Sequence, residues 1–206
     1  LNVFFPELND TKKRKPFSIK EISLLHDKCR STDDDVRHLV ALISDTGVRL
    51  GEATGLKVAD IKIDCPTPHI HIRPNPIRRL KTKQSERQVP LIGASLWAAK
   101  RLITNSSGDY AFPRYVKNGT CLSNSASATL NKWIRSNICN DLVVHGLRHG
   151  FRDRLREVGC PPEIADSLGG WSRNSIGESY GDGYSLKAKH EWLCKIALDL
   201  VQQIWL

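Results

Sequence analysis

Residues 60–91 differ in hydrophobic pattern from the rest of this chain, and that difference decides the fold class. Residues 61–63, 69–73 and 87–91 alternate between apolar and polar side chains or are rich in β-branched ones, and four prolines lie between the runs. Short runs bounded by turn residues predict β-strands, here a three-stranded antiparallel sheet. The remaining segments carry helical periodicity, so we predict a mainly α fold with a small antiparallel β-sheet, of the α+β class.

Helices are predicted both before and after this sheet in the sequence. Ser18 and Glu21 form a capping box that opens a helix over residues 18–29. An apolar stripe predicts a second helix over residues 33–46, and a short helix follows over residues 51–56. Beyond Gly93 the whole chain has a helical pattern, with helices predicted at residues 93–105, 123–138, 146–158, 161–169, 172–180 and 186–203.

The 206 residues suffice for one large domain, or for a domain with a small subdomain, and for a substantial core. Residues 1–16 are polar and basic after Pro6, which predicts a linker. Methionine is absent, even at position 1, so we expect the chain to be a fragment of something longer. No apolar run approaches the roughly 18 residues of a membrane-spanning helix, so we expect no membrane partner.

The composition favours a polyanionic partner. Lys and Arg number 31 against 22 Asp and Glu, which gives a net charge of +9 and a pI near 9.4. Charge alone does not decide the point, because many basic proteins bind no nucleic acid. The six cysteines have irregular spacing, with no CxxC pair and no Cys/His cluster of zinc-ligand spacing. We therefore expect reduced thiols, no metal and no cofactor.

Arg49 follows a predicted helix that ends in Asp45-Thr46-Gly47. Gly47 can adopt the left-handed conformation that ends a helix. The turn then projects Arg49 from a rigid helix end, and Glu52 lies close enough along the next helix to brace it. Taken alone, a surface Arg–Glu pair on one helix is the simpler interpretation.

His145 and Arg148 are three residues apart at a predicted helix start, so they share one face. The amino end of a helix favours anions, and an arginine there can bind a phosphate with two parallel hydrogen bonds. The alternative is a capping histidine beside a solvated arginine. Further basic side chains on this helix extend the expected basic surface: His149, Arg152, Arg154 and Arg156.

The predicted hairpin between the second and third strands is also basic. A turn that carries lysines can reach into a DNA groove, although a charged and solvated turn explains the same residues. The basic side chains of this hairpin are Arg78, Arg79, Lys81, Lys83 and Arg87.

Trp171 follows a predicted helix, and Tyr180 lies nine residues later beside Gly181. A tryptophan can donate its N–H to a phosphate oxygen or simply pack. A tyrosine beside glycines packs or hydrogen-bonds far more often than it acts as a nucleophile. Tyr184 is a second candidate for any such role.

Taken together and in order, these elements resemble the tyrosine recombinase (phage integrase) family. The string Thr-Gly-x-Arg-x-x-Glu at residues 46–52 resembles the family's first arginine box, and residues 143–151 resemble its second. Residues 80–91 resemble the lysine-bearing hairpin, and the spacing from Trp171 to Tyr180 matches the approach to the nucleophile. Gly146 departs from the family, which usually has a polar residue at that position.

The resemblance implies the fold of that family's catalytic domain over residues 17–206. Residues 1–16 would be the linker from a missing N-terminal DNA-binding domain. The apolar tail at residues 186–206 would pack on its own domain or on a neighbouring protomer. The implied partners are double-stranded DNA and further copies of the chain, as a tetramer on DNA, in the cytoplasm of a bacterium or phage host.

The resemblance also implies a mechanism, in which Tyr180 attacks a DNA phosphate and forms a 3′-phosphotyrosyl bond, releasing a 5′-hydroxyl. Arg49 and Arg148 would stabilise the transition state, and Trp171 would donate to the phosphate or pack. His145 would accept or position the tyrosine proton. Lys81 would protonate the leaving oxygen, with Lys83 as the alternative. Neither ATP nor a metal ion is needed.

Three other interpretations stay open from the sequence. A type IB topoisomerase uses similar Arg, Lys, His and Tyr chemistry to relax supercoils without site specificity. A DNA-binding module could keep the fold without catalysis. A helical interaction domain would have no role with nucleic acid, and any DNA binding would then respond little to salt.

Overall fold

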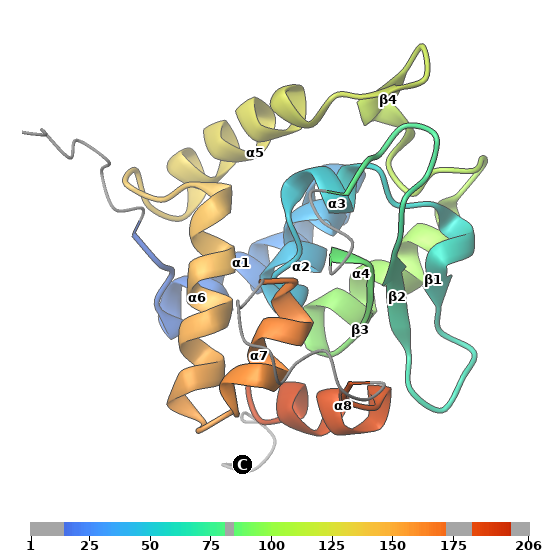
Figure 1. The fold of residues 1–206 in the computed structure, drawn as a ribbon. Helices are drawn as coiled ribbons and strands as arrows, with labels where there is room; N and C mark the ends of the chain where they lie inside the picture. Colours follow the sequence, from blue (N-terminus) through green and yellow to red (C-terminus); the bar gives the residue numbers. More distant parts are fainter. Residues whose placement is uncertain (1–14, 81–84, 172–182, 199–206) are drawn as a thin grey trace, which may run out of the picture.

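The computed structural model describes residues 15–80, 85–171 and 183–198, and these ranges form a mostly helical body with a small sheet at one side (Figure 1). Helix α1 (Ile19–Thr32) begins at the predicted capping box, in which Glu21 N donates to Ser18 Oγ and Ser18 N donates to the Glu21 carboxylate. It ends at Thr32, three residues later than the sequence predicts. None of the helices in the described ranges has the length and apolar character that crossing a lipid bilayer requires.

Helix α2 (Asp35–Thr46) is the centre of the core. Residues 38–46 are buried without interruption, so this helix is buried on nearly all sides rather than along one stripe. It packs against α1, α4 (Gly93–Asn105) and α6 (Val144–Glu157). Helix α3 (Leu50–Thr54) follows at once and contacts α5 (Ser123–Asn137), above α2 in Figure 1.

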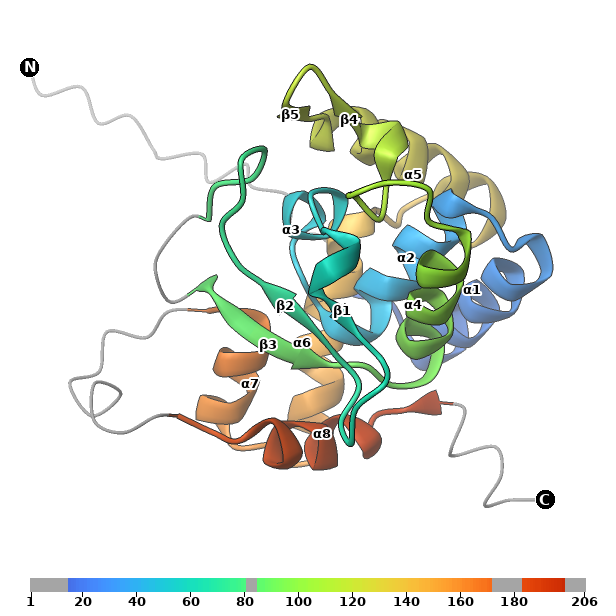
Figure 2. The same cartoon turned by 90° about the vertical axis from the view of Figure 1, so that its right-hand side faces the viewer.

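The predicted three-stranded antiparallel sheet is confirmed. Its strands are β1 (Ile61–Lys62), β2 (His69–Ile72) and β3 (Arg87–Pro90), which lie in that order after the short 3-10 helix Val58–Asp60. Helix α7 (Pro162–Gly169) and helix α8 (Leu186–Cys194) pack against β3, as Figure 2 shows. Strand β3 thus lies between β2 on one side and helices α7 and α8 on the other.

The helical pattern beyond Gly93 hid a second, two-stranded sheet. After the 3-10 helix Pro113–Tyr115, strand β4 (Val116–Lys117) pairs with β5 (Thr120–Cys121). The turn between them is Asn118-Gly119, and both residues have positive φ, 50° and 67°. Asn-Gly is the pair that tight hairpin turns of this kind prefer, so the turn chemistry was visible in the sequence and the strands were too short to recognise.

Helix α8 is shorter than predicted, because it stops at Cys194 rather than running to residue 203; residues 199–203 lie outside the described ranges. The chain leaves the helix through 3-10 turns, with Ile196 N donating to Leu193 O and Ala197 N to Cys194 O. The Ile196 carbonyl then accepts from Arg154 Nη1 at 3.3 Å. Ile196 and Ala197 are buried, so packing overrides the helical pattern. The predicted helix at 172–180 lies outside the described residues.

Arg154 was predicted on the basic surface, and that prediction is wrong. Its side chain is 4% exposed, its Nη1 lies 3.1 Å from Asp45 Oδ1, and its Nη2 donates to the Ser44 carbonyl. Asp45 Oδ2 accepts in turn from Ala94 N at the start of α4. A buried charge must be paired, and this pair joins α2, α4 and α6.

Gly47 ends α2 in the left-handed conformation, with φ 62°. A β-carbon there would lie 2.3 Å from the ring of Phe151 on α6. Gly47 is therefore required twice, by its backbone conformation and by the close approach of the next helix.

We predict that Gly47→Ala lowers the free energy of unfolding by about 2–5 kcal/mol, since left-handed strain and a clash with Phe151 add together. The matched control is Gly119→Ala, which has φ 67° but open space around the new β-carbon. The control should lose only the strain, about 1–2 kcal/mol. Urea unfolding of both variants measures the difference, and equal losses would show that the Phe151 contact does not matter.

Candidate active site

Arg49 is the residue before α3, three positions beyond the end of α2. Its backbone N donates to Glu52 Oε2 at 2.8 Å, and its Nη1 donates to Glu52 Oε1 at 2.7 Å. Its Nη2 donates to the Gly170 carbonyl at 2.9 Å. The predicted brace from Glu52 is confirmed, and the Arg49 side chain remains 31% exposed. Arg49 is thus oriented by protein contacts and still reaches solvent.

Glu52 is buried between two arginines from different parts of the chain. Besides Arg49, Arg87 of β3 donates from Nη2 to Oε2 at 2.8 Å and from Nη1 to Oε1 at 3.3 Å. Burial alone would raise the pKa of Glu52, but the charge and hydrogen bonds of Arg87, together with the hydrogen bonds from Arg49, hold that pKa below its ordinary value. The carboxylate therefore stays ionised in the site.

Arg148 reaches the same place from α6. Its Nη1 donates to the Gly47 carbonyl, at the end of α2. Its Nη2 is buried and has no hydrogen-bond partner among the residues that the structure describes. Burial, and then the positive charge of Arg49, lower the pKa of Arg148 to about 9, and Arg87 and Arg152 act in the same direction. An anion beside this guanidinium would raise its pKa again, because it would offset both the loss of hydration and the repulsion from Arg49.

Trp171 lies against the arginines directly after α7. Its ring is 4.3 Å from the guanidinium carbon of Arg148 and 4.6 Å from that of Arg152, within the range of cation–π attraction. A β-carbon at Gly169 would lie 2.0 Å from this ring, so the glycine makes room for it. The backbone N of Trp171 donates to Asp166 O at 3.0 Å. Packing on Arg148 is therefore one role of this tryptophan.

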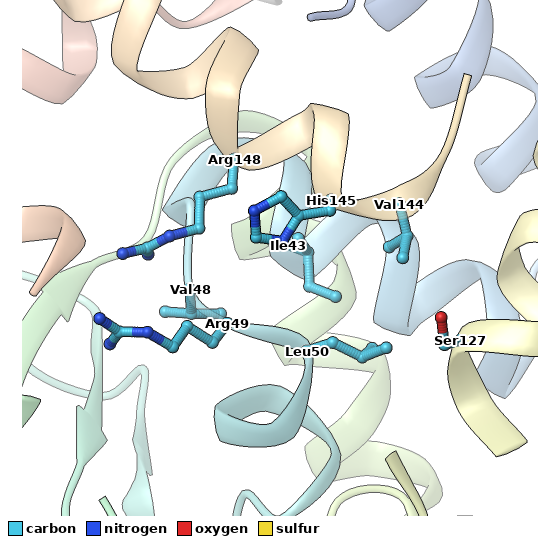
Figure 3. Close-up of a pocket in the computed structure, with 8 residues that line it drawn as sticks. All are labelled: Ile43, Val48, Arg49, Leu50, Ser127, Val144, His145 and Arg148. Atoms are coloured by element: carbon cyan, nitrogen blue, oxygen red, sulfur yellow. The ribbon is translucent and has the colours of Figure 1, made fainter. Parts of the chain in front are cut away.

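His145 lies on the first turn of α6 and is exposed, with its ring 5.0 Å from that of His149. Figure 3 shows Arg49 and Arg148 extending side by side from two different elements, with His145 next to Arg148. The three share a pocket of about 130 Å³, lined by Ile43, Val48, Arg49, Leu50, Ser127, Val144, His145 and Arg148. The structure thus brings together four of the predicted site residues: Arg49, His145, Arg148 and Trp171.

Gly146, where the sequence departs from the resemblance, has a structural reason. A β-carbon at this position would lie 2.5 Å from the Lys15 carbonyl oxygen and 3.3 Å from the Phe17 ring. One turn later, a β-carbon at Gly150 would lie 3.2 Å from the Phe17 carbonyl oxygen. The segment that enters α1 thus packs directly on the helix that carries His145 and Arg148.

The basic hairpin is only partly the solvated turn that the sequence predicts, because Arg78 and Arg87 are buried. Arg78 Nη1 donates to the Glu52 carbonyl at 2.6 Å, and Asn75 Nδ2 donates to the Gly55 carbonyl at 2.8 Å. The signal for Arg87 was its position two residues before the buried Val89, which places both on one face of the strand. An arginine at such a position needs a buried carboxylate, and Glu52 supplies it.

Lys81, Lys83 and Tyr180 lie outside the described residues. The chain on either side of residues 81–84 is anchored at the site, through Arg78 on one side and through Ser85, whose carbonyl accepts from Arg87 Nη1 at 2.7 Å, on the other. Residues 172–182 begin directly after Trp171. Tyr184, the alternative to Tyr180, is 42% exposed just before α8.

The sequence model of the phage integrase family matches residues 17–185. This chain belongs to the phage integrase family. It is 28% identical over 177 residues to the tyrosine recombinase XerD of Corynebacterium glutamicum, an alignment that covers 79% of this chain and 55% of the relative. The chain therefore spans about half the length of that relative.

Solved structures show the same fold at low sequence identity. XerH site-specific recombinase, bound to a palindromic difH substrate in a post-cleavage complex, matches with a TM-score of 0.58 and 16% identity over 93% of this chain and 52% of its own. The Tn1549 transposon integrase in complex with transposon right end DNA gives 0.59 and 19%, over 90% and 68%. XerA recombinase gives 0.59 and 17%, over 89% and 60%. The predicted fold class and family are thus confirmed.

The cysteines and acidic residues do not gather at this site. All six cysteines are free in the structure. Within residues 15–80, 85–171 and 183–198, no group of three or more His, Cys, Asp or Glu side chains is arranged to hold a metal ion.

The Glu52 environment predicts a specific pH dependence. Because the pKa of Glu52 is lowered on folding, the stability that its carboxylate contributes is fully present above pH 4.5, the ordinary glutamate value, and is lost as the pH falls through the lower folded value. We expect the stability difference between the unmodified chain and Glu52→Gln to shrink on acidification below that pH. Chemical unfolding of both proteins across the acid range measures it, and a pH-independent difference would contradict the pairing of Glu52 with Arg87.

Proposed function

We propose that residues 17–206 are the catalytic domain of a site-specific DNA recombinase that cuts and rejoins DNA through a 3′-phosphotyrosine intermediate. The observation that carries this proposal is the convergence of Arg49 and Arg148 on one pocket. Among the residues that the structure describes, a buried nitrogen of Arg148 has no hydrogen-bond partner there, and Arg49 is still partly exposed. Two guanidiniums in this state suit the non-bridging oxygens of one phosphate.

The protein's own charges support a reaction that needs no metal ion. A phosphodiester that accepts a nucleophile gains negative charge on its equatorial oxygens, and fixed cations in a partly dry site stabilise that charge. Arg49 and Arg148 are held before substrate arrives, by Glu52 and by the Gly47 carbonyl. We assign to them the neutralisation that nucleases with two metal ions give to those ions.

The remaining roles follow from chemistry and position. His145, at the exposed edge of the pocket, is assigned the tyrosine proton, and Trp171 holds the Arg148 guanidinium by stacking. We assign the leaving 5′-oxygen to Lys81, with Lys83 as the alternative, because the hairpin is anchored at Glu52 on both sides of these residues. Tyr180 is assigned as the nucleophile, nine residues beyond Trp171.

The partners that fit this function are double-stranded DNA and further copies of the chain. The solved relatives include recombinases whose structures contain their DNA substrates. The net charge of +9 is suited to a DNA backbone. We propose that the protein acts as a tetramer on DNA in the cytoplasm, that residues 1–16 connect to an N-terminal DNA-binding domain, and that the apolar tail at 186–206 packs on its own domain or a neighbour.

A covalent capture experiment tests the nucleophile. The chain is incubated with a pool of nicked duplexes whose central segment is randomised, so that cleavage releases a short strand and traps the adduct. We expect a covalent protein–DNA product that survives denaturation, and mass spectrometry of the peptide should locate the modification on Tyr180. Tyr180→Phe should bind DNA and form no adduct, because it lacks only the attacking oxygen.

The matched control is Tyr184→Phe, which should form the adduct as the unmodified chain does. An adduct from Tyr180→Phe, or none from the unmodified chain, would contradict the proposal. Relaxation of a supercoiled plasmid that lacks the captured sequence would instead favour a topoisomerase of type IB.

The two arginines give a second prediction. With the captured duplex, Arg49→Ala or Arg148→Ala should slow cleavage by at least about 10²-fold, the cost of losing one preorganised donor. Lysine at either position should not restore the rate, because a single ammonium cannot replace the planar fork. Arg101→Ala is the control, since this half-exposed arginine pairs with Asp33 away from the pocket. Near-normal cleavage by either lysine variant would refute the assignment.

A further inference from the structure

Arg87 is a buried cation of the site, and the assigned mechanism gives it no role. Its side chain is 4% exposed. Nε donates to the Leu168 carbonyl at 2.7 Å, Nη1 to the Ser85 carbonyl at 2.7 Å, and Nη2 to Glu52 Oε2 at 2.8 Å. All three nitrogens are therefore engaged with the protein. Because this side chain is buried and bound to the protein, its effect on the reaction passes through its neighbours.

Those neighbours are the groups that hold the catalytic candidates. Glu52, which Arg87 grips with two nitrogens, is the carboxylate that orients Arg49. Gly170, whose carbonyl accepts from Arg49, lies so close that a β-carbon there would be 2.7 Å from Arg87 Nη1. Trp171, stacked on Arg148, is the next residue. Arg87 thus contacts the supports of Arg49 and lies beside Gly170, the residue before the support of Arg148.

Arg87 also connects the two segments that would carry the proton donor and the nucleophile. Through the Ser85 carbonyl it holds the end of the hairpin that contains Lys81 and Lys83. Through the Leu168 carbonyl it holds the end of α7, four residues before residue 172. Its charge reaches α8 as well, since burial and then Arg87 lower the pKa of Lys189. One side chain therefore contacts the chain directly after residues 81–84 and the end of the helix that precedes residue 172.

We propose that Arg87 is a positioning residue for the cleavage reaction, acting through Glu52 on Arg49 and through the Leu168–Gly170 turn on Trp171. This inference rests on the proposed recombinase function. With Arg87 present, Glu52 divides its two oxygens between two guanidiniums. Without it, Glu52 would be left to Arg49 alone, and the Arg49 donors would turn from the phosphate towards the carboxylate.

The test measures single-turnover cleavage of the captured duplex at saturating DNA. Arg87→Gln should lower the rate constant on the order of 10–10²-fold, the effect of a small misplacement of catalytic groups. The dissociation constant for DNA should stay nearly unchanged, because Arg87 does not touch DNA. A loss of folded protein alone would lower the amplitude and leave the rate constant intact, so the two readouts separate positioning from stability.

Two further variants locate the path of the effect. Arg87→Lys keeps a charge beside Glu52 without the fork, so its rate should fall between those of the unmodified chain and Arg87→Gln. In a double-mutant cycle, Arg87→Gln should slow cleavage less in the Glu52→Gln background than in the unmodified chain, because both changes act on Arg49, and the slowing that remains measures the route through the Leu168–Gly170 turn. The control Arg73→Gln removes an arginine of the same sheet from a different buried carboxylate, Asp60, and should leave the rate constant unchanged.

The outcomes separate the two proposals. No adduct from the unmodified chain would overturn the proposed function, and this inference with it. An adduct from the unmodified chain with unchanged rate constants for the Arg87 variants would overturn this inference alone. Fully multiplicative effects in the cycle would overturn the route through Glu52. If neither Arg87 variant folds, Arg87 belongs to the folding core, and the positioning role is likewise overturned.

Discussion

The buried carboxylate of Glu52 is the interaction on which the site depends. An ionised carboxylate removed from water costs several kcal/mol unless cations and hydrogen bonds replace its hydration. In this chain the replacements come from two arginines. Arg49 directly precedes α3, the helix that carries Glu52, and Arg87 lies in β3, 35 residues beyond Glu52. Satisfying one charge therefore fixes α3 to the sheet. The Arg49 guanidinium takes its orientation from this arrangement and from Gly170.

The site as a whole carries more positive charge than it neutralises. Arg49 and Arg87 share the single carboxylate of Glu52, and Arg152 pairs with Asp166, whereas among the described residues Arg148 has the Gly47 carbonyl and the Trp171 ring as partners. Burial, and then the positive charge of Arg49, lower the pKa of Arg148. An anion beside this guanidinium would offset both effects, so the excess positive charge favours an anionic partner.

The parts of the fold that depend on local sequence could be predicted, and the parts that depend on distant pairing could not. The capping box at Ser18 and the glycine end of α2 are local, and both were predicted correctly. The burial of Arg154 and Arg87 was not predicted, because each depends on a carboxylate, Asp45 or Glu52, that only the folded chain brings near. Helical periodicity places Arg154 on the same face of α6 as Phe151 and Arg156 on the opposite face, but it does not supply the carboxylate that a buried arginine needs.

The separation of Arg49 and Arg148 follows from one contact between helices. Arg49 lies two residues beyond Gly47, and Arg148 lies one helical turn before Phe151. The Phe151 ring rests where a β-carbon of Gly47 would be, so α2 and α6 approach as closely as two backbones with one aromatic ring between them allow. Arg148 then donates to the Gly47 carbonyl itself. Because the interior is close-packed, this distance can change only if the core rearranges. The packing of α2 against α6 thus sets the distance between the two guanidiniums. It holds the two like charges at one pocket in spite of their mutual repulsion.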